Sequence, residues 1–119
     1  MGLSIAIVGS RGFQDYARLC AFIRSKVDVQ QVDQVVSGGA RGADRLGERF
    51  ADELGLAVLI YLPDWDRYGK RAGLLRNDRI IESADLVFAF WDGSSRGTGY
   101  TIDKALRAGK NVYVCKAAG

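Results

Sequence analysis

Short apolar runs alternate with helix-like segments along the chain, and this alternation constrains the fold more than any other feature of the sequence. Runs of strand length cover residues 3–8, 31–36, 56–62, 86–91 and 112–115. Between them, apolar residues recur at helical spacing over residues 16–27, 43–54, 74–84 and 102–109, as in amphipathic helices. Strands that alternate with helices pair in parallel, and the helices cover both faces of the sheet.

The sequence therefore predicts an α/β fold built on a five-stranded parallel sheet. Because crossovers between parallel strands are right-handed, few strand orders are available, and we expect the Rossmann-like order 3-2-1-4-5 with three layers. The chain has 119 residues, which is enough for one compact domain and too few for two. We expect residues 1–119 to form a single domain.

The composition narrows the chemistry. The chain contains no histidine and two cysteines, which removes histidine acid–base catalysis and most zinc sites, so we expect neither a metal nor a cofactor. The net charge of +3 permits an anionic ligand but is far from that of a dedicated DNA-binding arm. Apolar runs are too short to span a membrane, and the N-terminus lacks the positive start of a signal peptide. A cytoplasmic protein without a membrane partner is expected.

Three glycine-rich loops are expected to meet at one edge of the sheet. In such folds, ligands bind beyond the carboxyl ends of the strands, near the point where the strand order reverses. That point lies between the first and fourth strands, which are followed by residues 9–13 and 91–100. The second strand, next to the first, is followed by residues 37–44.

The loop of residues 37–42, Ser-Gly-Gly-Ala-Arg-Gly, leads from the second strand into a helix. Glycine lets backbone approach a ligand closely, and the free N–H groups of the next helix favour an anion. The alternative is a tight turn that serves only helix–sheet packing. Asp44, in the first helical turn, either complements the helix dipole or contacts a ribose hydroxyl.

The other two loops carry hydroxyls and arginines. Residues 91–99 contain three glycines and two candidate phosphate ligands, Ser95 and Thr98, beside Arg96. The start of a single helix does not require so many glycines and hydroxyls, so ligand binding is favoured over a flexible turn without a binding role. In the loop after the first strand, Arg11 either pairs bidentately with phosphate or is simply solvated.

The segment DWDRYGKRAG, residues 64–73, is expected to be a loop. Trp65 and Tyr68 are aromatic side chains that could stack on a base, although Trp65 could equally anchor a core or an interface. Asp64 and Asp66 are the nearest approach to a carboxylate pair. Arg76 and Asn77 follow one turn into the next helix, where an arginine is usually solvated unless its helix lines the cleft.

Together these motifs resemble the SLOG superfamily, and most closely its YspA-like, cpYpsA-related branch. The resemblance spans residues 5–114 and rests on residues 8–11, 37–44, 63–65, 68–69, 76–77, 91–93 and 96–98. It implies a Rossmann-like fold and a ligand that is a nucleotide or is derived from one. It also implies a homo-oligomer, a dimer or larger, for which the apolar faces of the third and fourth helices could provide the interface.

The chain is also similar in part to the Lonely Guy phosphoribohydrolases of this superfamily, which cleave the N-glycosidic bond of nucleoside monophosphates. Arg76 matches their helix arginine. Gly93, Gly97 and Thr98 match their Gly-Gly-x-Gly-Thr-x-x-Glu motif approximately, with one extra residue between the glycines. The glutamate position is Thr101, which cannot supply a carboxylate, and Asp103 would project from a different face of the helix. The remaining catalytic candidates are Arg76, Asp64 and Asp92.

The loop of residues 37–44 further resembles the glycine-arginine loop of DNA-processing protein A, which binds single-stranded DNA. Such binding needs a basic groove with stacking aromatics, for which this sequence offers less support. Nucleic acid is therefore the weaker partner prediction, and a nucleotide-type small molecule is the stronger one.

The resemblance favours a protein that binds a phosphorylated nucleoside or an ADP-ribose-like ligand as a sensor, carrier or sequestering protein. The alternatives are an N-glycosidic-bond enzyme, either a hydrolase or a deoxyribosyltransferase, and a single-stranded nucleic-acid binder. The residues expected at the ligand are Gly9, Ser10, Arg11, Ser37, Gly38, Gly39, Arg41, Gly42, Asp44, Trp65, Tyr68, Arg76, Asn77, Asp92, Gly93, Ser95, Gly97 and Thr98.

Overall fold

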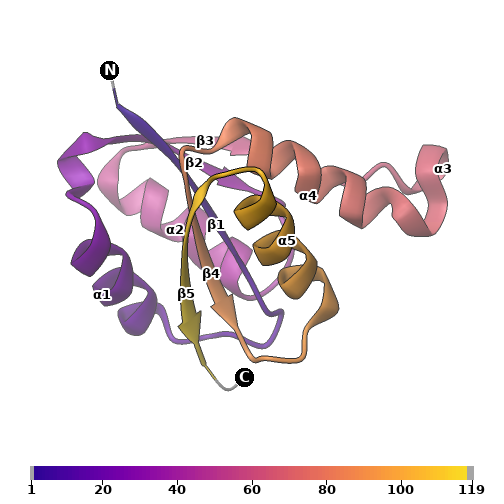
Figure 1. Cartoon of the computed structure of the whole chain (residues 1–119). Helices are drawn as coiled ribbons and strands as arrows, with labels where there is room; N and C mark the ends of the chain where they lie inside the picture. The colour runs from indigo at the N-terminus through magenta and orange to yellow at the C-terminus, as the bar shows by residue number, and fades with distance from the viewer. Residues whose placement is uncertain (1, 118–119) are drawn as a thin grey trace.

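The computed structural model describes residues 2–117 as a parallel sheet with helices on both faces (Figure 1). Strands and helices alternate as the apolar pattern predicts. In chain order the elements are β1 (Leu3–Gly9), α1 (Tyr16–Lys26), β2 (Val32–Ser37), α2 (Ala43–Leu54), β3 (Ala57–Ile60), α3 (Trp65–Tyr68), α4 (Ala72–Ser83), β4 (Leu86–Trp91), α5 (Arg96–Arg107) and β5 (Asn111–Lys116). Single 3₁₀ turns, Val29–Gln31 and Gly69–Arg71, precede β2 and α4.

The strand order is β3-β2-β1-β4-β5, and every neighbouring pair is parallel. This confirms the predicted fold class and strand order. The central strand β1 pairs with β2 and with β4, so that Ile5 lies opposite Val35 on one side and Leu86 on the other. The order reverses between β1 and β4, and their carboxyl ends therefore form the place where a ligand is expected.

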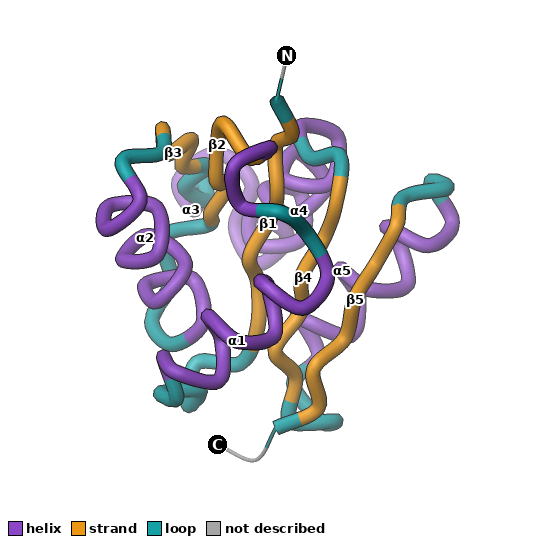
Figure 2. Tube along the Cα trace, turned by 90° about the vertical axis from the view of Figure 1, so that its left-hand side faces the viewer, coloured by secondary structure: helices purple, strands orange, loops and turns teal. Residues whose placement is uncertain are grey.

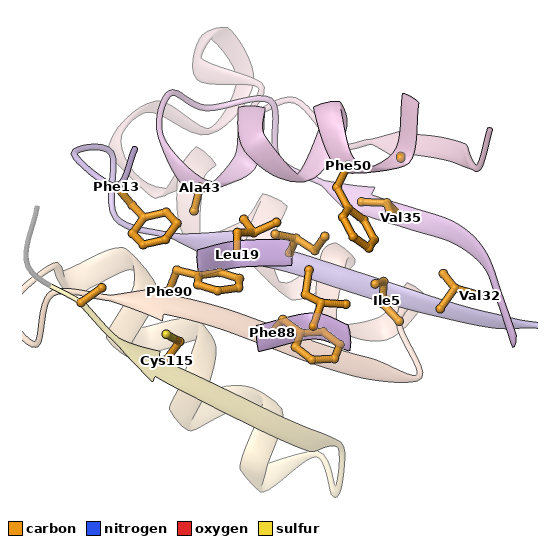
Figure 3. Packing of buried hydrophobic residues seen from close by; sticks show 14 residues of the cluster. Ile5, Phe13, Leu19, Val32, Val35, Ala43, Phe50, Phe88, Phe90 and Cys115 are labelled. Carbon is orange, nitrogen blue, oxygen red and sulfur yellow. The ribbon is translucent and has the colours of Figure 1, made fainter. Parts of the chain in front are cut away.

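The period-2 alternation of the strands divides the apolar side chains between two cores. Ile5 and Ile7 of β1 and Phe88 and Phe90 of β4 point to the face covered by α1 and α2, and Figure 3 shows this cluster from close by. The residues between them, such as Ala6, pack against α4 and α5 instead. Figure 2 looks onto the face of the sheet, with the strands side by side, α1 toward the viewer and α5 beyond the strands.

Burial of these side chains stabilises the fold. Phe50, Phe88 and Phe90 are at most 1% exposed, and a fully buried side chain of this kind contributes about 1.5–3 kcal/mol. A buried cluster covers each face of the sheet that presents the loops. None of the helices within residues 2–117 combines the length and the apolar character that a membrane crossing would need.

The structure differs from the sequence-based expectation between β3 and α4. Most of residues 64–73, expected to be a loop, form α3 and a 3₁₀ turn. The side chain of Asp64 accepts the N–H of Arg67 at 3.1 Å and so caps this short helix. No apolar periodicity marks a single helical turn, which is why the pattern missed it.

Two helices also begin earlier than their apolar spacing indicated. Helix α4 begins at Ala72 and α5 at Arg96, whereas the periodic residues begin at Leu74 and Ile102. The first turn of α5 is polar and glycine-rich, so its helical start leaves no apolar signal. As a result, Gly97 and Thr98 lie in a helix rather than in the loop before it.

Candidate functional site

A cavity of about 470 Å³ lies at the carboxyl ends of β1 and β4. All three glycine-rich segments and helix α4 contribute to its wall, so the loops converge as the sequence predicted. The lining residues are Val8, Gly9, Arg11, Gly12, Ala40, Asp44, Arg76, Asn77, Asp92, Ser95, Gly97, Thr98 and Thr101. We refer to this space as the first cavity.

Ser10 joins the three loops to one another. It is 2% exposed, and its carbonyl oxygen accepts the N–H of Ala43 at 3.3 Å, where α2 begins. Its own N–H donates to the carbonyl oxygen of Phe90 at 2.9 Å. Its hydroxyl oxygen accepts the N–H of Asp92 at 3.1 Å. All of these contacts are internal, so Ser10, expected at the ligand, holds the wall of the cavity in place.

Two glycines make this close packing possible. A Cβ on Gly9 would collide with the carbonyl oxygen of Phe90 and would lie 2.7 Å from the Cβ of Ala43. Gly42 has a φ of +79° and is the N-cap residue before α2, and a Cβ there would collide with the carbonyl oxygens of Ser10 and Arg11. These positions therefore require glycine for packing and backbone conformation.

Arg76 reaches the first cavity from α4 and is anchored by its neighbours. Its guanidinium donates to the carbonyl oxygens of Gly38 and, at 3.4 Å, Tyr61. Its Nε donates to Oδ1 of Asn77 at 2.8 Å. Burial lowers the pKa of Arg76 from its ordinary value, while the charge of Asp44 opposes that shift. An arginine stays protonated in proteins, so the cavity wall carries a fixed positive charge.

Asp44 is a buried carboxyl group in the wall of the same cavity. It is 6% exposed, and its Oδ2 accepts the N–H of Ala40 at 3.2 Å. Burial raises the pKa of Asp44 to about 6, against the opposite influence of the Ala40 N–H and of Arg76. A Cβ on Gly38 would lie 2.6 Å from Arg76 Nη1 and 2.9 Å from this Oδ2. Because Gly38 has no side chain, the guanidinium of Arg76 and the carboxyl group of Asp44 can both lie next to it.

The starts of α2 and α5 both face the first cavity, but they differ in what they can bind. Helix α2 already has an acid, Asp44, in its first turn. The first turn of α5 has no acidic residue, and no side chain caps it at Ser95. A Cβ on Gly97 would meet nothing within 4 Å, so this end of α5 is open. Free N–H groups at an open helix start attract anions.

The loop before α5 is held by Asp92. Its Oδ1 accepts the N–H groups of Ser94 at 2.8 Å and Ser95 at 2.7 Å. These N–H groups lower the pKa of Asp92 below its usual range, so the carboxylate is ionised and committed to the loop. Gly93, with a φ of +90°, provides the turn between Asp92 and Ser94.

Several residues expected at the ligand lie elsewhere. Ser37 is buried, donates to Glu48 Oε2 at 2.8 Å and accepts the N–H of Gly39 at 3.2 Å. Arg41 is exposed and does not line the first cavity. Trp65, 54% exposed, and Tyr68, 43% exposed, lie on α3 outside it. Ser10, Gly38, Gly42 and Gly93 support the wall, and Asp64 lines a different cavity together with Tyr68.

The sequence interpretation missed other lining residues. Val8, Gly12, Ala40 and Thr101 contribute to the first cavity. Thr101 is 1% exposed, and its hydroxyl donates to the carbonyl oxygen of Gly97 at 2.9 Å. Its spacing of three residues from Thr98 on a helix was the available signal, because such residues share a face. Within residues 2–117, no group of three or more metal-ligating side chains is arranged to hold a metal ion.

The fold and the site define a Rossmann-like α/β protein with an anion-compatible cavity at the switch point of its sheet. The chain belongs to the YspA, cpYpsA-related SLOG family, whose model matches residues 3–68. This confirms the family resemblance read from the motifs, and membership is consistent with a nucleotide-related function. The matched residues include the first two glycine-rich loops and end at Tyr68.

A curated relative extends the similarity over most of the chain. The Gene 61 protein of Mycobacterium phage D29 is 32% identical over 112 residues, which cover 88% of this chain and 90% of that protein. No solved structure matches the chain.

Proposed function

We propose that the protein binds a nucleotide or a nucleotide derivative such as ADP-ribose, and that it acts as a sensor, carrier or sequestering protein. The observation that carries this proposal is the open start of α5 at Gly97, which faces a cavity also lined by Arg76 and Arg11. Backbone N–H groups and guanidinium groups are the usual partners of phosphate.

The size and charge of the first cavity support this ligand class. Its volume of about 470 Å³ falls within the range of about 300–1,000 Å³ found for small-molecule sites. Arg76 is fixed by hydrogen bonds to backbone carbonyls, so little side-chain freedom is lost when an anion binds. Arg11 is exposed and contributes a second positive charge at the opening.

A Lonely Guy-type hydrolysis is poorly supported, because α5 offers no carboxylate to the cavity. Thr101 occupies the position of the motif glutamate, and its hydroxyl is directed to the carbonyl oxygen of Gly97. Asp103 lies on the outer side of α5, where it pairs with Arg107 at 3.1 Å. Both side chains are exposed.

A second candidate function, chemistry at an N-glycosidic bond, is favoured by Asp44 alone. A carboxyl group whose pKa lies near 6 can hold or release a proton close to neutral pH, and this one lies in the same wall as Arg76. Of the earlier candidates, Asp64 lies outside the first cavity, and Asp92 is bound to the amides of its own loop. Asp44 is therefore the better catalytic candidate.

Isothermal titration calorimetry with ribose 5-phosphate, AMP and ADP-ribose tests the binding proposal. We expect at least one of these to bind, and we expect Arg76→Gln to weaken that binding by roughly tenfold or more, since a charge-assisted hydrogen bond contributes about 1.5–3 kcal/mol. Arg107→Gln changes an arginine at the far end of α5 and should have no effect. Equal affinities for wild type and Arg76→Gln would contradict the proposal.

Chromatography of the same mixtures separates binding from catalysis. A binding protein returns AMP intact. Free adenine, absent when Asp44→Asn replaces the wild type, would establish the second candidate function instead. Retention of that activity in Asp44→Asn would exclude Asp44 as the working carboxylate.

A further inference from the structure

A second cavity, of about 380 Å³, lies beyond the carboxyl end of β3. Leu62, just after β3, and Tyr68, on α3, form one side of it, and α4 forms the other through residues such as Leu75 and Arg79. Figure 1 shows α3 held away from the sheet, at the far end of α4. Helix α3 thus borders a second cavity to which the proposed phosphate site assigns no ligand group.

The two cavities are neighbours, because Arg76 lines both. Its guanidinium is bonded to the carbonyl oxygens of Gly38, at the first cavity's side, and Tyr61, which precedes Leu62. The helical spacing of α4 places Ala72, Leu75 and Arg79 on the same side as Arg76. Arg76 therefore forms a boundary that the two cavities share, and a ligand that occupied both would pass beside its side chain along α4.

The lining of the second cavity differs from that of the first. Its apolar part includes Leu62, Leu75 and the ring of Tyr68, a residue that is 43% exposed and has the Arg67 guanidinium 5.1 Å from its ring centroid. Around this part lie carboxylates, including Glu82, and the guanidinium groups of Arg67 and Arg79. An apolar surface ringed by both acceptors and donors suits a flat, uncharged ring with polar edges. It does not suit a second phosphate.

We propose that the second cavity is the nucleobase subsite for a ligand whose phosphate lies in the first cavity. This assignment rests on the proposed function, because it takes the phosphate position from it. The base stacks on Tyr68 and Leu75, its amino and ring nitrogen groups meet the carboxylates and guanidinium groups of the rim, and Arg76 lies between base and phosphate. The protein then selects nucleotides over sugar phosphates through α3.

The test compares a ligand with and without a base. Calorimetry is performed with ribose 5-phosphate and with ADP-ribose on wild type, Tyr68→Ala and Trp65→Ala. Trp65 is the matched control, because it lies on the same short helix and lines neither cavity. We expect Tyr68→Ala to weaken ADP-ribose binding roughly tenfold, as the loss of a base–aromatic stack does, and to leave ribose 5-phosphate binding unchanged. Trp65→Ala should change neither.

A variant on α4 distinguishes the loss of a binding surface from an unfolding of α3 caused by Tyr68→Ala. Leu75→Gln alters the same cavity from a twelve-residue helix and should repeat the selective loss. If Tyr68→Ala and Leu75→Gln both bind ADP-ribose as wild type does, or if they weaken ribose 5-phosphate equally, the subsite is overturned while the phosphate site stands. If wild type binds neither ligand, the proposed function fails and the subsite fails with it.

Discussion

Replacing Asp44 by asparagine should change how the stability of the protein depends on pH. The amide keeps an oxygen that can accept the N–H of Ala40 but cannot ionise. In the wild type, burial raises the pKa of Asp44 from 3.8 to about 6. The folded protein therefore binds this proton more tightly than the unfolded chain does. Stability from this group is fully present below about pH 4 and is lost as the pH rises through about 6.

The size of the effect follows from the shift. One pKa unit corresponds to about 1.4 kcal/mol, so ionising Asp44 costs the folded state about 3 kcal/mol in total, of which about 2 kcal/mol falls between pH 4.5 and pH 8. Across that interval, the unfolding free energy of Asp44→Asn should rise by about 2 kcal/mol relative to that of the wild type.

Urea denaturation followed by the fluorescence of Trp65 and Trp91 measures this difference. The control is Asp103→Asn, which makes the same substitution at an exposed carboxylate on α5 and should not reproduce the rise expected of Asp44→Asn. A stability difference between Asp44→Asn and the wild type that stays constant from acidic to alkaline pH would contradict the raised pKa of Asp44. It would mean that Asp44 titrates in the folded protein as it does in the unfolded chain.

Three further results are expected. Gly97→Ala should stabilise the fold by about 0.5–1 kcal/mol, because a Cβ meets nothing there and glycine is unfavourable within a helix. The same change should weaken ADP-ribose binding in calorimetry, and an unchanged affinity would mean that no ligand approaches α5. Gly42→Ala should destabilise the fold by on the order of 2–4 kcal/mol in urea denaturation, given the φ of +79° and the clash with Ser10. A midpoint equal to that of the wild type would contradict the packing described. ADP-ribose, whose diphosphate does not titrate near neutrality, should bind less tightly as the pH rises through about 6. Asp44→Asn should remove this pH dependence, and the same pH profile in both proteins would assign the dependence to another group.

The sheet could be predicted because the apolar runs mark its strands, and right-handed crossovers then limit the order of those strands. Ile5, Ala6 and Ile7 alternate between two cores, and five such runs leave few topologies. The convergence of the loops followed from the topology alone. Helix α3 could not be predicted, because it depends on a polar cap from Asp64 and its single turn is too short to show an apolar repeat.

Within the site, residue types alone did not separate the residues that line the first cavity from those that support its wall. Ser10 and Ser37 have hydroxyls suited to phosphate, but both are buried and bonded within the protein. Arg76 was recognisable only through the family motif, because its role depends on how α4 lies against the loop at Gly38. The raised pKa of Asp44 likewise arises from tertiary burial, which a single sequence does not display.

The most direct test of the central claim is the position of the bound phosphate. In ¹H–¹⁵N NMR spectra of the protein titrated with ADP-ribose, a phosphate at the start of α5 should give the largest shifts at the backbone amides of Gly97 and Thr98 and at the Nε–H of Arg76. The amide of Ala43, which is bonded to Ser10, should move less. Shifts centred on the start of α2, or none at α5, would contradict a phosphate site at the switch point of the sheet.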